Sequence, residues 1–106
     1  MLREILLGFV RVHVLHHAAD EPFYGAWMME ELGSHGYDVG PGTLYPILHR
    51  MEEDGYLTVE ERTEGGRVRK YYAATDLGRE ALAEARAKAA ELTREVAPPD
   101  PPSPND

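Results

Sequence analysis

The sequence predicts a mainly α protein, a winged helix-turn-helix with one β-hairpin wing and a C-terminal dimerisation helix. Three observations lead to this fold class. A short amphipathic helix over 41–54 runs directly into two strand-like segments joined by Gly65-Gly66. Basic residues gather at the start of the second strand, and the last helix carries a heptad-like apolar repeat. A helix with a small, polar start followed by a basic hairpin is the layout of a DNA-binding winged helix, so double-stranded DNA is the expected partner.

The sequence signals for the first two helices are weaker than those for the third. Apolar residues cover more than one face of residues 1–17, which is typical of a helix buried on two sides. We therefore expect this helix to pack on its own domain and on a second subunit, with Leu6 and Phe9 in the dimer contact. A turn over 18–23, which contains a proline, leads to a second helix over 24–32.

The third helix is predicted to be the recognition helix. Pro41 suits its first turn, because the missing N–H of proline would have no partner there. Gly55 follows the last periodic residue and ends the helix. One apolar face is formed by Leu44, Ile47, Leu48 and Met51. The residues of this helix expected to contact DNA are Pro41, Gly42, Thr43, Tyr45 and Arg50.

Two of these residues have alternative roles that spacing alone leaves open. The ring of Tyr45 would instead pack under the hairpin. Arg50 would instead form an ion pair with Glu53 or Asp54, which lie one turn further along the same helix.

The hairpin is predicted from strands over 57–63 and 68–74, because a Gly-Gly pair between two strand-like runs is a strong signal for a tight turn. Arg67, Arg69 and Lys70 of the return strand are expected to contact DNA. Side chains alternate across a strand, so Arg67 and Arg69 face one side and Lys70 faces the other. The alternative is a charged hairpin that is simply solvated.

Thr75 is the predicted N-cap of the last helix, with Asp76 in the first turn, where the helix dipole favours an anion. Apolar and small residues then repeat at spacings of three and four, which indicates a seam that packs on a partner helix. The seam consists of Leu82, Ala85, Ala89, Leu92 and Val96. The chain therefore divides into a winged helix-turn-helix DNA-binding domain over 1–74, a dimerisation helix over 75–96 and a proline-rich, disordered tail over 97–106.

Length and composition exclude several classes of protein. At 106 residues the chain is a single domain, small enough that a partner subunit would add to a modest core. It has no cysteine, which excludes disulfides and cysteine-based metal or redox sites. No segment reaches the roughly 20 apolar residues of a membrane span. The N-terminus lacks the cleavage site of a signal peptide, so the expected location is cytoplasmic.

The net charge of −8 is the main argument against DNA binding, because DNA-binding domains usually carry a basic excess. Basic residues are concentrated in the hairpin, however, where Arg62, Arg67, Arg69 and Lys70 are accompanied by the single acid Glu64. A dimer would present two basic hairpins to one duplex and keep its acids on the far side. The acidic charge keeps open the alternative of a winged-helix protein-interaction module.

Two stretches of the sequence resemble the PadR family of bacterial transcriptional regulators. They are PGTLYPILHRMEEDGYL and GGRVRKYYAATDLGREAL, and the similarity runs from about Val12 to Leu92. The resemblance implies a homodimeric winged-helix repressor, and the shortness of the chain suggests the small subgroup with one C-terminal dimerisation helix. Family members commonly have HGYEL where this chain has YGAWM over 24–28. Ala26 replaces the family's tyrosine near the DNA backbone, so that contact is not carried over.

Histidines of the first helix form a second candidate site. His13 and His17 lie one turn apart on one face, a spacing that lets two imidazoles share a metal ion. A third ligand would come from Asp20, Glu21 or another chain. The alternative is that the histidines lie at a surface or interface and hydrogen-bond to carboxylates. A divalent metal is therefore one candidate effector.

A small molecule is the other candidate effector. Trp27 would line its pocket together with the first and last helices, or would be a buried core residue. No enzymatic constellation is found, because the adjacent Ser34 and His35 lack an orienting acid and no phosphate-binding loop occurs. The expected function is sequence-specific DNA binding by an effector-responsive homodimeric repressor, with a metal-responsive repressor as an alternative.

Overall fold

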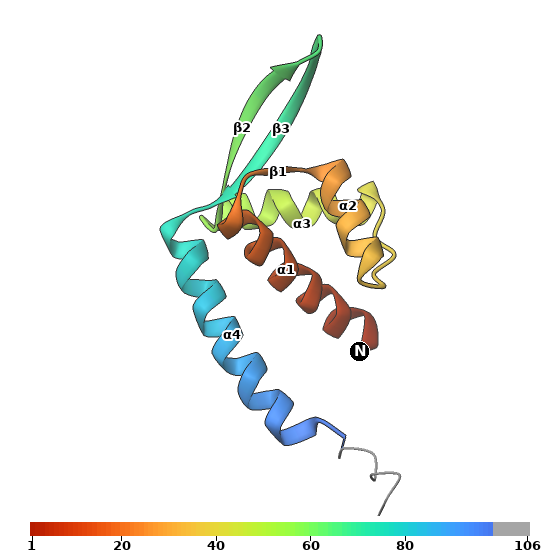
Figure 1. Ribbon diagram of the computed structural model, residues 1–106, viewed down its shortest axis with the longest axis vertical. Coiled ribbons are helices and arrows are strands. Elements are labelled where there is room, and N and C mark those ends of the chain that lie inside the picture. Colours follow the sequence, from red (N-terminus) through yellow and green to blue (C-terminus); the bar gives the residue numbers. More distant parts are fainter. Residues whose placement is uncertain (99–106) are drawn as a thin grey trace, which may run out of the picture.

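The computed structural model describes residues 1–98, which form four helices and three strands. In chain order these are α1 (Leu2–Asp20), β1 (Phe23–Tyr24), α2 (Gly25–Ser34), α3 (Pro41–Glu53), β2 (Leu57–Glu64), β3 (Arg67–Ala74) and α4 (Asp76–Val96). Helices α1, α2 and α3 pack together, the β2–β3 hairpin projects upward, and α4 runs downward beside α1 (Figure 1). This arrangement confirms the predicted winged helix-turn-helix. From residue 99 on, the predicted disordered tail lies outside the described residues.

The segment between the first two helices differs from the prediction. Helix α1 continues to Asp20, beyond its expected end, and a two-residue strand, β1, takes the last residue of the expected turn and the first residue of the expected second helix. The helix ends because Pro22 disfavours the helical conformation at Glu21, which is extended with φ −157°. Strand β1 forms because its residues pair antiparallel with Tyr71 and Tyr72 of β3. No local pattern in the sequence signals that long-range pairing.

The sheet is antiparallel with strand order β1-β3-β2. Strands β2 and β3 pair along their whole length, starting with Leu57 opposite Ala74. At the tip, Gly65 and Gly66 have φ values of 56° and 76°. Two consecutive positive φ angles are what this type of two-residue hairpin turn requires, and glycine adopts them without strain. The hairpin is therefore confirmed, and its tip stands clear of the helices (Figure 1).

One hydrophobic core joins the helices to the base of the sheet. Its largest fully buried side chains come from α1, α2, α3 and β3 and are Val10, Val14, Met28, Leu32, Leu44, Leu48 and Tyr72. The apolar face predicted for the third helix is buried in this core. Leu82, expected at a dimer contact, is only 3% exposed. It belongs to the core of its own subunit instead, because α4 packs on α1 and β3.

Helix α4 begins at the predicted cap. The backbone N–H of Gly78 donates to Thr75 Oγ1 at 3.0 Å, and the N–H of Thr75 donates to the carbonyl of Tyr56 at 3.1 Å. Gly78 is buried, and a Cβ at this position would collide with the same Tyr56 carbonyl. The first turn of α4 therefore lies tightly against the segment before β2. Within residues 1–98, no helix is long and apolar enough to cross a membrane.

Candidate nucleic-acid interface

The start of α3 is open to the surface. Pro41 and Gly42 are exposed, and no neighbouring atom lies within 4 Å of the point where a Cβ of Gly42 would be. Thr43 is half-buried, and its hydroxyl oxygen accepts a hydrogen bond from Arg3 of α1 at 3.5 Å. The N–H groups of a first helical turn carry the positive end of the helix dipole. This end of α3 is therefore suited to approach a phosphate or a base edge.

Tyr45 connects α3 to its neighbours. Its ring packs against Gly25 of α2, where a Cβ would overlap the ring. The same ring lines a surface hollow together with Arg67, Arg69 and Lys70 of β3. Tyr45 is therefore half-buried between α2 and the hairpin, an arrangement close to the packing role that the sequence left open. The start of α3 and the basic residues of β3 therefore lie on one surface, with Tyr45 between them.

Arg50 forms the ion pair that was expected as its alternative role. Its Nε donates to Asp54 Oδ2 at 3.1 Å, one turn further along. The Arg50 side chain is 73% exposed, and such a solvent-exposed helical pair is worth only about 0.3–0.5 kcal/mol. A phosphate group approaching α3 would therefore displace Asp54 at little cost.

The three basic residues of β3 lie in different environments. The guanidinium of Arg69 stacks on the ring of Tyr24, 4.2 Å from its centroid. Arg67 and Lys70 are exposed, and within residues 1–98 no carboxylate forms an ion pair with either. Strand alternation places Lys70 on the face that carries the buried Tyr72 and places the two arginines on the other. Arg67 and Lys70 are therefore the cations most available to a polyanion.

Two tyrosines that support the hairpin arginines were missed by the sequence analysis. Tyr24 is one, and Tyr71 is the other, with the guanidinium carbon of Arg62 4.3 Å from its ring centroid. The hydroxyl of Tyr71 donates to the Glu64 carboxylate at 2.9 Å, and that hydrogen bond raises the pKa of Tyr71. These stacks join different strands, so they are visible only once the register of the sheet is known.

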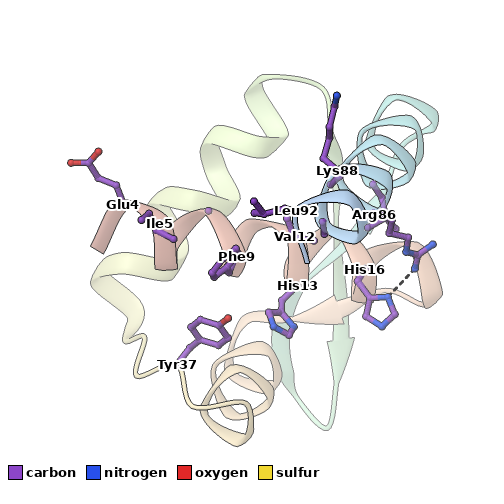
Figure 2. A pocket seen from close by; sticks show the side chains of 14 residues that line it. Glu4, Ile5, Phe9, Val12, His13, His16, Tyr37, Arg86, Lys88 and Leu92 are labelled. Atoms are coloured by element: carbon purple, nitrogen blue, oxygen red, sulfur yellow. Dashed lines mark hydrogen bonds between the residues drawn. The ribbon is translucent and has the colours of Figure 1, made fainter. Parts of the chain in front are cut away.

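An apolar hollow of about 750 Å³ lies between α1 and α4 (Figure 2). Its apolar lining includes Ile5, Phe9, Val12, Ala85, Ala89 and Leu92. Phe9 and Leu92 are 45% and 48% exposed, which is high for large apolar side chains, and Leu6 and Val96 on the same two helices are also exposed. We call this surface the α1–α4 face. Every residue predicted at the dimer contact lies on α1 or α4. All of them except the buried Leu82 are at least partly exposed.

Trp27 does not line this hollow. Its ring centroid lies 5.3 Å from that of His17 and 6.3 Å from that of Phe23, and the residue is 38% exposed. Helices α2 and α4 flank different sides of α1 (Figure 1). Trp27 is therefore not buried in the core, and it lines a surface hollow with His17, Asp20 and Glu21 of the α1 end, not with α4. Its role as an effector-pocket residue stays a prediction.

The histidines of α1 meet a third histidine from outside the helix. The ligating nitrogens of His13, His17 and His35 all lie within 4.8 Å of one another. The expected third ligand, Asp20 or Glu21, is not part of this group. His35 caps the C-terminus of α2, and only the packing of α2 on α1 brings it to the other two. In the sequence, His35 stands out only as the neighbour of Ser34, and nothing there predicts that it joins the histidines of α1.

The exposed start of α3, the basic strand beside it and the three-stranded sheet together define a DNA-binding protein of the winged-helix class. Residues 14–84 match the model of the Transcriptional regulator PadR-like family. The chain belongs to this family, so it is a DNA-binding transcriptional regulator and not an enzyme. The resemblance seen in the sequence is confirmed.

Individual relatives are similar over most of the chain. It is 55% identical over 95 residues to the transcriptional regulator Rv3488 of Mycobacterium tuberculosis, covering 90% of this chain and 89% of that protein. The crystal structure of a PadR-like transcriptional regulator from Bacillus cereus matches with a TM-score of 0.81 at 29% identity, over 88% of this chain and 92% of the other. A PadR family regulator from Eggerthella lenta matches with a TM-score of 0.79 at 35% identity, over 91% and 85%.

Proposed function

We propose that this protein is a homodimeric, effector-responsive repressor that binds DNA sequence-specifically through α3 and the β2–β3 hairpin. Each α3 would enter the major groove, and each hairpin would lie on the adjacent backbone or minor groove. One observation carries the proposal: Tyr45 of α3 lines the same surface hollow as Arg67 and Lys70 of β3. A base-reading helix and free cations therefore share one surface.

Some residues of this surface would contact base edges, and others would contact phosphates and position the protein on the DNA. Gly42 and Thr43, in the open first turn of α3, would approach base edges, because they are small enough to let the helix come close. Arg67 and Lys70 would neutralise phosphates and set the register of the protein on the duplex. Arg69 would act from its stacked position on Tyr24, which limits its reach.

The α1–α4 face supports the dimer. Phe9 and Leu92 expose large apolar surfaces there, and a contiguous exposed apolar surface is typical of a protein interface. A two-fold dimer through this face would present two copies of α3 to one side of the DNA. If the two helices enter successive major grooves, they are about 34 Å apart, so the operator would be an inverted repeat.

The hollow on this face also suggests how an effector would act. A small apolar ligand bound between α1 and α4 would favour one separation of the two recognition helices, and DNA affinity would change with it. A metal-responsive repressor that uses His13 and His17 is a second candidate, favoured by the group that these two residues form with His35. Family membership favours both over a module that binds only proteins.

Selection of genomic DNA by the full chain at low salt, followed by sequencing, tests the proposed function. We expect the enriched fragments to share an inverted repeat with half-site centres about 10 bp apart. On that repeat, the logarithm of the binding constant should fall linearly with the logarithm of salt concentration, because phosphate contacts release counterions. Enrichment without a shared motif would contradict sequence-specific binding, and a salt-independent affinity would contradict the phosphate contacts.

A further inference from the structure

Four side chains able to bind a metal converge where α1 meets the end of α2. His13 and His17 are one turn apart on α1, and Glu31 and His35 are one turn apart at the C-terminal end of α2. The nitrogens of the three histidines lie within 4.8 Å of one another. Each helix therefore contributes a pair of residues with the spacing that lets two side chains reach one ion, and the pairs face each other.

Glu31 completes the group on the α2 side. Its Oε1 lies 3.4 Å from Nε2 of His17 and 3.2 Å from Nε2 of His35. A tetrahedral zinc ion, with bonds of about 2.0–2.1 Å, keeps its ligand atoms about 3.3 Å apart. The two distances from Glu31 to His17 and to His35 therefore already have nearly this value. The nitrogens of the three histidines, which lie within 4.8 Å of one another, would need to approach by at most about 1.5 Å to reach the same spacing.

A histidine cluster held only by hydrogen bonds is the competing explanation. One bond of this kind is present, between the His35 ring and Glu31 at 3.2 Å. Nε2 of His17 is buried, however, and has no hydrogen-bond partner among residues 1–98, because its contact with Glu31 does not have hydrogen-bond geometry. Buried polar atoms normally have a partner, and an exception calls for an explanation such as an ion. Hydrogen bonding therefore leaves the cluster incomplete.

Two histidines of the cluster have pKa values below the ordinary value for the side chain. Burial lowers the pKa of His13 and His17. The neighbouring imidazole of His35 lowers the pKa of His13 further, whereas the Glu31 carboxylate acts in the opposite direction on both. Only a neutral imidazole offers a lone pair to a cation.

Aromatic residues border the cluster, and His13 and Tyr37 also line the hollow of the α1–α4 face. The ring centroid of Tyr37 lies 5.2 Å from that of His13, and Trp27 lies 5.3 Å from His17. Figure 2 shows His13 turned toward Tyr37, whereas His16 points to α4 and contacts Arg86. Because α2 packs against α1, Trp27 lies beside His17 and outside the hollow between α1 and α4.

We propose a tetrahedral site between α1 and α2 for one divalent cation of the zinc class, with the ligands His13, His17, His35 and Glu31. Three imidazoles and one carboxylate favour a borderline-soft ion such as zinc over magnesium or calcium, which require oxygen ligands. The bound ion would tie α1 to the end of α2. This inference deepens the metal-responsive candidate of the proposed function by naming its ligands, and zinc binding is measured separately from DNA binding.

Calorimetric titration of zinc alone into the metal-free full chain tests the site. We expect one ion per chain. His35→Ala should weaken binding by more than about 100-fold, since loss of a mere outer-shell partner already costs 10- to 100-fold. Glu31→Gln, which keeps the size of the side chain and removes its charge, should weaken it by at least about 10-fold. The matched control is His49→Ala, which removes an exposed imidazole of α3 and should bind zinc as the parent does.

His35 is 48% exposed, so its replacement should leave the fold intact, which circular dichroism would verify. Equal zinc affinity in the parent and His35→Ala would overturn the proposal, as would a stoichiometry well below one ion per chain. Cobalt(II) is a second probe of the geometry. A tetrahedral site gives an intense visible absorption band, and the weak spectrum of a six-coordinate ion would overturn the four-ligand site.

Discussion

At Gly78 and Gly25, the absence of a side chain decides how closely two elements approach. A Cβ on Gly78 would collide with the carbonyl oxygen of Tyr56, and a Cβ on Gly25 would overlap the ring of Tyr45. The first neighbour is backbone and cannot move aside, whereas the second is a side chain that can. Substitution at Gly78 should therefore affect stability, and substitution at Gly25 should affect the DNA-binding surface.

Gly78→Ala is expected to lower the free energy of unfolding by about 1–3 kcal/mol, the usual cost of inserting a methyl group into a packed site. Urea denaturation followed by circular dichroism would measure it. Gly33→Ala is the matched control, because Gly33 is also helical and no atom lies within 4 Å of its Cβ position. That variant should be neutral or gain up to about 1 kcal/mol from helix propensity. Equal effects in the two variants would show that the contact with Tyr56 is unimportant.

The free cations of the hairpin define a second prediction at the residue scale. Arg67→Ala and Lys70→Ala should each weaken binding to all DNA sequences by similar factors and reduce the salt slope by about one unit. Fluorescence anisotropy at several salt concentrations would measure both. Arg94→Ala removes the same charge from the far end of α4 and should leave the slope unchanged. An unchanged slope in both hairpin variants, with the fold intact, would exclude the hairpin from phosphate binding.

Among the elements, α4 changes its environment along its length. Near its start, Leu82 is buried in the core of its own subunit, whereas Leu92, later in the helix, is 48% exposed. The same apolar repeat therefore includes a residue that stabilises the fold and residues that remain open for a partner. Because the exposed part faces α1 across an apolar hollow, α1 and α4 together form the surface proposed for the dimer.

Leu92→Glu should convert the protein to a monomer and abolish operator binding. Burying a carboxylate without a partner in a dimer contact is costly, while in the isolated subunit the side chain stays in water. Sedimentation velocity at micromolar concentration would measure the assembly state. Leu77→Glu is the matched control, since Leu77 is 47% exposed on the same helix but does not line the hollow. A parent chain that is already monomeric would refute the dimer.

For the molecule as a whole, α1 is the element that the proposed activities share. It packs on α2, β3 and α4, and it carries core residues, two histidines of the proposed metal site and one side of the α1–α4 face. His13 belongs to both the site and the lining of the hollow. A ligand bound on any side of α1 therefore acts on the helix that would set the dimer geometry. In the proposed dimer, this arrangement would connect effector binding to the separation of the two copies of α3.

Zinc should stabilise the whole fold if the proposed site exists. At a free concentration of 100 times Kd, a ligand adds about 2.7 kcal/mol to the stability of the folded state. For a domain of this size, that corresponds to a rise in Tm of roughly 10–20 °C. Thermal denaturation with and without zinc would measure the shift. His49→Ala should show the same rise and His35→Ala none, and a rise that persists in His35→Ala would place the ion elsewhere.

Several elements could be predicted because their signals lie within a few residues. The apolar face of α3, with Pro41 before it and Gly55 after it, predicts the recognition helix, and the structure places that helix at Pro41–Glu53. Gly65-Gly66 predicts the hairpin turn, and Thr75 predicts the cap of α4. Helix periodicity, capping and turn chemistry are local properties of the backbone. The basic residues of β3 follow the predicted turn directly, so their place on the hairpin could be predicted as well.

Other features are decided only when distant segments pack together. Strand β1 exists because Phe23 and Tyr24 pair with β3, and Arg69 is held by a tyrosine from that strand. Leu82 is buried by its own subunit, although its position in the repeat suggests a dimer contact. His35 joins the histidines of α1 because α2 packs on α1. The sequence alone determines which segments form helices and tight turns, because the interactions that favour them join residues only a few positions apart. Burial and the composition of a site arise from the shared core, so only the tertiary structure decides them.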